Sequence, residues 1–174
     1  MSPAMDLKQY IRDVPGFPEP NVVFRDITPL LQEPEVFHYV IDQLATRYRP
    51  MKIDAVVGIE ARGFIFGAPL ALAINAAFVP IRKKGKLPST TVQMQYALEY
   101  GTATIEIHKD AVAPNKRVLI VDDVLATGGT MVAARKLIDH LGGNVVGLAV
   151  IIELKFLKGR ERLGSDGLFS LVSY

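Results

Sequence analysis

Two adjacent carboxylates followed by a run of small residues carry the clearest chemistry in this sequence. Asp122 and Asp123 follow the apolar residues 118–121, and residues 126–130 contain two glycines and two threonines. The glycines allow the backbone to turn tightly and to approach a ligand. A helix is predicted to begin here, so the amides of this loop favour an anion. We predict a phosphate site, with the two acids on sugar hydroxyls or on Mg²⁺ through water, because carboxylates repel a phosphate.

An ordinary helix cap after a core strand is the alternative interpretation of this loop. Asp and Thr are good N-cap residues, and a Gly-Gly pair alone indicates little. A cap does not explain two carboxylates side by side before such a loop. The sequence contains neither the G-x-x-x-x-G-K-[ST] pattern of P-loop kinases nor the G-x-G-x-x-G pattern of dinucleotide-binding proteins.

Composition limits the class of protein. The 174 residues suit one domain, and 49% apolar with 22% charged residues is a globular profile. The net charge of +2 gives no reason to expect nucleic acid as a partner, and the lack of cysteine excludes disulfides and cysteine-based zinc sites. The apolar residues 64–81 are interrupted by Pro69, Asn75 and Pro80 and suit a buried helix and strand better than a membrane span. Residues 1–12 lack the apolar core of a signal peptide, so we expect a cytoplasmic protein without a membrane partner.

Apolar periodicity predicts helices that alternate with strands. The helices are expected at residues 5–13, 35–48, 63–74, 129–141 and 155–163, and the strands at 54–59, 77–81, 117–121, 145–152 and 168–172. This alternation indicates an α/β fold with a mainly parallel sheet. Such folds bind ligands at the carboxyl ends of their strands, so the chemistry is expected in the loops after Ile59, Ile81 and Val121.

Three further segments complete the prediction. Residues 15–20, rich in proline, should be extended and irregular, and residues 82–88 should form a basic loop. Residues 90–108 alternate weakly, have few large apolar side chains on any one face, and carry Glu99, Tyr100 and Gly101 in the middle. They are expected to form an antiparallel hairpin or a mobile flap.

Residues 118–130 resemble the phosphoribosyl-pyrophosphate signature of type I phosphoribosyltransferases. Other segments are similar to the adenine phosphoribosyltransferases, in the family's order and over nearly the whole chain. They are residues 17–29, 58–64, 81–88, 98–101, 153–154 and 157–161. The resemblance implies one domain, 1–174, with the type I fold: a twisted, mainly parallel sheet flanked by helices in a core of residues 35–174. It also implies a small hood from residues 1–34 and the C-terminal segment, and a flexible flap at about 83–108.

The resemblance assigns the phosphoribosyl pyrophosphate contacts. Asp122 and Asp123 would hold the ribose hydroxyls. The 5′-phosphate would lie on Ala126, Thr127, Gly128, Gly129 and Thr130. The pyrophosphate would contact Glu60, Ala61, Arg62, Gly63, Arg82, Lys83 and Lys86, with a cis peptide between Glu60 and Ala61. Without the resemblance, a surface charge explains Arg62 equally well, and the basic loop is by default a solvated loop. Family members are homodimers, which would let Arg82 act in the partner's site.

The same resemblance assigns the base to adenine, with contacts from Val23, Phe24, Arg25 and Val124. A backbone carbonyl in residues 23–25 can accept a hydrogen bond from the adenine amine. A 6-oxo purine would present a carbonyl acceptor at the same place, so that this buried hydrogen bond could not form. Phe24 can stack on the base, although a core position explains this residue equally well without the resemblance.

The reaction implied is adenine plus phosphoribosyl pyrophosphate giving AMP and pyrophosphate, with Mg²⁺ bound mainly through substrate oxygens. The catalytic assignments are Glu99, which would manage the adenine ring proton, Tyr100, which would close over the substrate, and Arg62. An exposed acid in a hairpin turn is the alternative for Glu99. A related enzyme for another base, or a regulator that binds the same ligand without catalysis, are the alternative functions, and no helix-turn-helix or basic extension supports the regulator.

Overall fold

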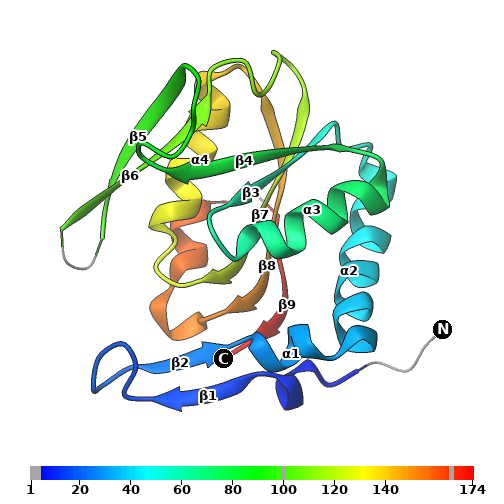
Figure 1. Cartoon of the computed structure of the whole chain (residues 1–174), viewed down its shortest axis with the longest axis vertical. Coiled ribbons are helices and arrows are strands. Elements are labelled where there is room, and N and C mark those ends of the chain that lie inside the picture. The colour runs from blue at the N-terminus through cyan, green and yellow to red at the C-terminus, as the bar shows by residue number, and fades with distance from the viewer. Residues whose placement is uncertain (1–4, 99–100, 165–166) are drawn as a thin grey trace. The chain divides into compact units, whose positions relative to one another are not determined.

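The computed structural model describes residues 5–98, 101–164 and 167–174, and over these residues the chain divides into two units, Met1–Gln43 and Leu44–Tyr174 (Figure 1). Glu99 and Tyr100 lie outside the described residues. Each unit has its own sheet and is described by itself. That the chain is one domain with a hood at residues 1–34 stays a prediction.

The first unit is built on a hairpin that the sequence analysis missed. A short 3-10 helix, η1 (Leu7–Tyr10), is capped by the Asp6 side chain, and strand β1 (Arg12–Pro15) then pairs antiparallel with β2 (Val23–Asp26). Helices α1 (Thr28–Gln32) and α2 (Pro34–Tyr48) follow, and α2 continues into the second unit. The helix expected at residues 5–13 is therefore shorter, because β1 begins at Arg12.

Within the described part of the second unit, seven strands form one sheet in the order β5-β6-β4-β3-β7-β8-β9 (Figure 1). Five of them are parallel neighbours: β4 (Ala77–Lys83), β3 (Ala55–Ile59), β7 (Arg117–Leu125), β8 (Asn144–Glu153) and β9 (Leu168–Ser173). The hairpin of β5 (Thr91–Ala97) and β6 (Thr102–His108) joins antiparallel at β4. The α/β fold with a mainly parallel sheet, predicted from the sequence, is confirmed.

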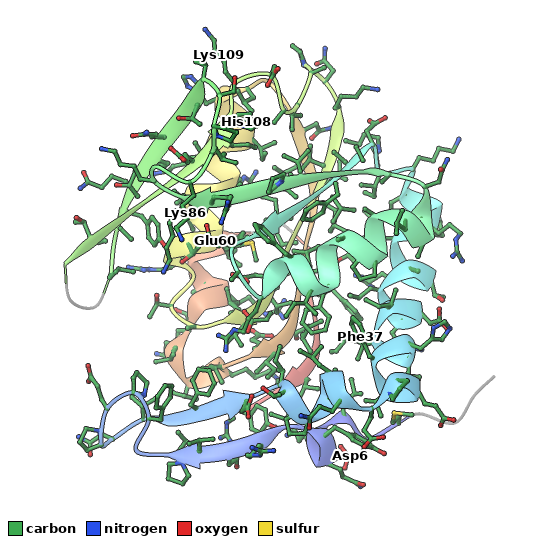
Figure 2. All side chains as sticks on the ribbon, in the orientation of Figure 1. Asp6, Phe37, Glu60, Lys86, His108 and Lys109 are labelled. Carbon is green, nitrogen blue, oxygen red and sulfur yellow. The ribbon has the colours of Figure 1, made fainter. Side chains whose placement is uncertain are left out.

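Helices α3 (Gly63–Ile74) and α4 (Gly129–His140) cover opposite faces of this sheet. Side chains alternate along a strand, so Val57, Ile59, Val118 and Ile120 face the core under α4. The intervening positions face α3, where Phe78 and Phe64 meet edge to face at 5.7 Å. The buried face of α2 includes Val36, Val40, Ile41, Leu44 and Tyr48. Phe37, next to Val36, is only half-buried (Figure 2).

Three expectations about the second unit were wrong in detail. Strand β7 does not end at Val121 but continues to Leu125, and β4 continues into the predicted basic loop as far as Lys83. The helix expected at residues 155–163 is two short 3-10 helices, η3 (Lys155–Leu157) and η4 (Gly159–Leu163); a third, η2 (Arg49–Met51), follows α2.

The hairpin also buries more apolar surface than its weak alternation indicated. Ile105 and Ile107 of β6 are buried, and Val92, Met94 and Tyr96 of β5 pack against the core under α4. The base of the hairpin is therefore anchored in the core. No helix among the described residues is long and apolar enough to cross a membrane.

Candidate active site

The paired acids lie on an extension of β7 beyond its pairing with β3. That pairing ends with Gly58 opposite Val121, whereas β7 stays paired with β8 until Leu125 lies opposite Glu153. The edge of β7 at Asp122 therefore faces the turn that connects β3 to α3. Both acids are held in an extended strand, rather than in the flexible loop that a strand ending at Val121 would have given.

Gly63 brings the turn after β3 close to the acids. A Cβ atom at this residue would lie 2.8 Å from the Val121 carbonyl oxygen and 3.2 Å from Asp122 Oδ1, so a larger residue would push α3 away from β7. The close approach places Arg62 Nε 2.7 Å from Asp123 Oδ2. The peptide between Glu60 and Ala61 is cis, as the family resemblance implied. Arg62, Gly63, Asp122 and Asp123, assigned to two subsites from the sequence, are thus neighbours.

The electrostatics of the two acids favour a ligand that donates hydrogen bonds. Burial raises the pKa of Asp122 well above that of an ordinary carboxyl group, and the negative charge of Asp123 raises it further. The Asp123 N–H donates to Asp122 Oδ1 at 2.8 Å, and the Arg62 charge opposes the shift. A vicinal diol can donate to both carboxyl groups and reduce their repulsion, whereas a phosphate would increase it.

The loop after β7 has the shape expected of an anion site. Gly128 has φ 84°, a left-handed conformation that favours glycine, and is the N-cap of α4. A depression of about 70 Å³ is lined by Asp122, Val124 and residues 125–131. It contains every residue that the sequence analysis assigned to the 5′-phosphate. The N-terminus of α4 directs backbone N–H groups and a positive dipole end to this place.

Gly159 packs against the backbone of the loop after β7, a contact that was not predicted from the sequence. A Cβ atom at Gly159 would lie 2.2 Å from the Ala126 carbonyl oxygen and 3.0 Å from the Gly128 nitrogen. Arg160, the next residue, donates from Nε to Glu153 at 2.8 Å, and Glu153 also accepts from Ser170 at 2.9 Å. Glu153 is only 2% exposed. Gly159 and Glu153 lie in segments similar to the family, and that similarity was the only sequence signal for them.

Glu60 gathers the basic residues at the end of β4. Its carboxylate accepts from the Lys83 N–H at 2.9 Å and from Arg82 Nε at 3.2 Å, and lies 3.7 Å from Lys86 Nζ (Figure 2). Burial alone would raise the pKa of Glu60, but these donors and charges together lower it. The structure therefore brings together four of the seven predicted pyrophosphate residues, Glu60, Arg82, Lys83 and Lys86. Because Glu60 is an acid, it orients the Arg82 and Lys86 cations, and holds Lys83 by its backbone, but cannot itself attract an anion.

Glu106 is a second support for this cluster that sequence reasoning missed. It is 2% exposed and accepts from the Lys86 and Leu87 N–H groups at 3.0 Å, and from Thr91 and Gln93 at 3.3 and 3.2 Å. Burial would raise the pKa of Glu106, but the backbone donors lower it. An acid between two buried isoleucines of a strand was the available signal.

The residues assigned to adenine belong to both units. Val23, Phe24 and Arg25 form most of β2 in the first unit, where Phe24 packs edge to face on Phe17 at 5.3 Å and Arg25 forms an ion pair with Asp13. Val124 belongs to β7 in the second unit. Their contact with a base stays a prediction, as do the catalytic roles of Glu99 and Tyr100.

The side chains of the described residues form no obvious metal-binding centre of their own. No group of three or more His, Cys, Asp or Glu side chains in this part of the chain is placed to hold a metal ion. Asp122 and Asp123 are the paired carboxylates at the site.

Comparison with known proteins agrees with this fold. Residues 27–168 match the family described as the phosphoribosyl transferase domain, so the class of protein is a phosphoribosyltransferase. The adenine phosphoribosyltransferase of Solibacter usitatus is 57% identical over 97% of this chain and 98% of its own length. By this similarity over nearly the full length, the chain belongs to the adenine phosphoribosyltransferase family of phosphoribosyl-transferring enzymes.

Solved structures support the same assignment. The adenine phosphoribosyltransferase of Thermoanaerobacter pseudethanolicus has a TM-score of 0.94 and 48% identity over 97% of this chain and 98% of that one. The Saccharomyces cerevisiae enzyme, solved with D-2,5-dideoxy-2,5-imino-altritol 1,6-bisphosphate and adenine, has a TM-score of 0.89 and 41% identity over 95% of this chain and 96% of that one. The type I phosphoribosyltransferase fold expected from the sequence is confirmed.

Proposed function

We propose that this protein transfers the 5-phosphoribosyl group from phosphoribosyl pyrophosphate to adenine, giving AMP and pyrophosphate. The observation that carries the proposal is the placement of Asp122 and Asp123 between an anion loop at the N-terminus of α4 and the cation Arg62. A phosphorylated sugar with a pyrophosphate leaving group matches this arrangement, because it carries a phosphate, a diol and a second anionic group in the same order. Relatives named adenine phosphoribosyltransferase support adenine as the acceptor.

Each part of this substrate has a partner of matching charge. The 5′-phosphate would accept hydrogen bonds from residues 126–130, and the ribose hydroxyls would donate to Asp122 and Asp123. The pyrophosphate would lie toward Arg62, toward the Arg82 and Lys86 cations that Glu60 orients, and toward Lys83, whose backbone Glu60 holds. Positive charge fixed in advance at a leaving group stabilises the charge that develops in the transition state.

The chemistry requires positioning more than a nucleophilic side chain. The bond between the anomeric carbon and the pyrophosphate oxygen breaks ahead of bond formation with adenine, so the sugar becomes cationic and the electron pair leaves with pyrophosphate. The adenine ring nitrogen then bonds to the same carbon and loses its proton, for which we propose Glu99 as the acceptor, with Tyr100 closing over the substrate. Water must be kept out during this step because it would capture the cation.

Mg²⁺ is proposed as the cofactor, bound mainly through the oxygens of the substrate. Asp122 and Asp123 suit it, because carboxylate oxygens are the ligands it prefers, directly or through water. When bound, the ion would neutralise charge on the leaving pyrophosphate. The proposal keeps the adenine contacts implied by the family resemblance, Val23 to Arg25 and Val124.

A homodimer in the cytoplasm completes the proposal. Helix α3 carries apolar residues on all sides, and its Leu72 is 85% exposed in the single chain. An exposed apolar helix face of this kind suits an interface with a second copy of the chain. Arg82 lies near the end of β4, the strand that follows α3 in the chain, and in such a dimer it can act in the partner's site.

A competition assay tests this function. The protein is incubated with Mg²⁺, phosphoribosyl pyrophosphate and equal concentrations of adenine, hypoxanthine and guanine, and the nucleotides are separated. We expect AMP to form faster than the other products by a factor of roughly 100 or more. Equal rates with hypoxanthine would contradict the adenine assignment, and absence of any nucleotide would contradict phosphoribosyl transfer.

A further inference from the structure

Tyr96 connects the β5–β6 hairpin to the loop assigned to the 5′-phosphate. The Thr130 hydroxyl donates to the Tyr96 hydroxyl at 3.2 Å. A Cβ atom at Gly129 would lie 3.5 Å from the Tyr96 ring and 3.3 Å from the Ala97 carbonyl oxygen. The end of β5 therefore lies directly on the first turn of α4, at the residues where the anion is expected.

The position of the Tyr96 hydroxyl is determined by the hairpin and its packing. Tyr96 lies opposite Ala103 in the β5–β6 pairing, and Val92, Met94 and Tyr96, on one face of β5, pack against the core under α4. A groove of about 360 Å³ opens between the two elements beside this contact, lined by Tyr96 and Gly129 and, farther along α4, by Val132 and Lys136. The Tyr96–Thr130 hydrogen bond is thus a defined contact at the edge of this groove.

A hydroxyl group donates one hydrogen bond and accepts others, and its hydrogen rotates to suit its partners. When Thr130 donates to a phosphate oxygen, its own oxygen is left to accept. The Tyr96 O–H, 3.2 Å away, is placed to donate to it. The chain Tyr96 to Thr130 to phosphate would then consist of two hydrogen bonds that polarise one another in the same direction.

We propose that Tyr96 is a positioning residue for the 5′-phosphate, holding Thr130 in the orientation that donates to it. The proposal rests on the proposed function, because the phosphate is that of the sugar substrate. Tyr96 lies on the hairpin shortly before Glu99, so the contact also joins the phosphate site to the segment that carries the proposed proton acceptor.

The test is Tyr96→Phe, which removes the hydroxyl and keeps the ring. We expect the KM for phosphoribosyl pyrophosphate to rise about 3- to 10-fold, the effect of one hydrogen bond, with kcat and the KM for adenine within twofold of the parent enzyme. Ribose 5-phosphate, titrated directly by calorimetry, should bind more weakly by the same factor. In a Thr130→Val background, Tyr96→Phe should add no further loss, because the effect acts through that hydroxyl.

Thr102→Val is the matched control. It removes a hydroxyl that bonds Gln95 at 3.0 Å on the opposite face of the same hairpin from Tyr96, and should leave all of these values unchanged. Unchanged affinity of Tyr96→Phe for ribose 5-phosphate would overturn the proposal. An equal rise in the KM for adenine would also overturn it, and so would a loss of ribose 5-phosphate affinity that adds to the loss caused by Thr130→Val. The calorimetry of Tyr96→Phe alone does not depend on the folding of the Thr130 variant. If the parent enzyme forms no AMP but Tyr96→Phe weakens ribose 5-phosphate binding, the proposed function fails and the role of Tyr96 stands.

Discussion

Gly159→Ala should disturb the phosphate loop from a residue that lies outside it. The added Cβ would lie 2.2 Å from the Ala126 carbonyl oxygen, whereas real Cβ atoms keep at least 3.0 Å, so one of the two must move by about 0.8 Å. The opposing atoms belong to backbone, and the Arg160–Glu153 hydrogen bonds hold the Gly159 side in place. We therefore expect most of the movement in residues 126–128.

A displacement of this size in a positioning element can cost up to about 100-fold in rate. We expect the KM for phosphoribosyl pyrophosphate to rise roughly 10- to 100-fold in steady-state kinetics. Overpacking costs about 1–3 kcal/mol, which lowers the melting temperature of a chain of this length by roughly 2–12 °C, so the variant stays folded at 25 °C.

Gly167→Ala is the matched control for this prediction. No atom lies within 4 Å of the position that its Cβ would take, so the kinetics should not change. If Gly159→Ala binds phosphoribosyl pyrophosphate as tightly as the parent enzyme, Gly159 does not support the loop in the way described.

Three further predictions concern the proposed dimer, the buried acid Glu153 and the hairpin. Leu72→Glu places a charge on the exposed apolar face of α3 and should convert a dimer to monomers in sedimentation; an unchanged dimer would exclude this face as the interface. Hydrogen bonds from Arg160 lower the pKa of Glu153 in the folded protein. The ionised carboxylate therefore stabilises the fold above the pKa of the unfolded chain, and this stabilisation is lost as pH falls from about 5 toward the lowered folded-state pKa. Melting temperatures should thus fall less steeply with acid in Glu153→Gln than in the parent enzyme, and parallel curves would refute this. Glu99→Ala should lower kcat far more than it weakens substrate binding, and an unchanged kcat would remove Glu99 from proton transfer.

The parallel core of the fold was predictable because its strands are buried on both faces. Such strands are continuous apolar runs, as at residues 118–121, and the amphipathic α2 and α4 stand out beside them. The end of β7 was placed too early because two aspartates look like the end of a core strand. In fact the pairing with β8 continues past them. The β1–β2 hairpin was hidden by the prolines and glycine of its loop.

The site was predictable where its residues are contiguous in sequence. Residues 122–130 carry both the acids and the anion loop, so a local motif describes them. The supports of the site depend on contacts between distant segments: Gly159 with Ala126, Tyr96 with Thr130, and Glu106 with the backbone of Lys86. Nothing in the local sequence around Gly159 indicates which backbone will press against it.

The most direct test of the account is ligand binding to the variant with both Asp122→Asn and Asp123→Asn. Calorimetry with phosphoribosyl pyrophosphate and Mg²⁺ measures the affinity, and circular dichroism confirms that the variant is folded. Because the acids are proposed to hold sugar hydroxyls, we predict a folded protein with greatly weakened binding and almost no AMP formation. A folded variant that keeps most of its affinity and activity would contradict the central claim that these acids hold the phosphorylated sugar. A variant that cannot fold would favour the alternative that these acids serve only to support the fold.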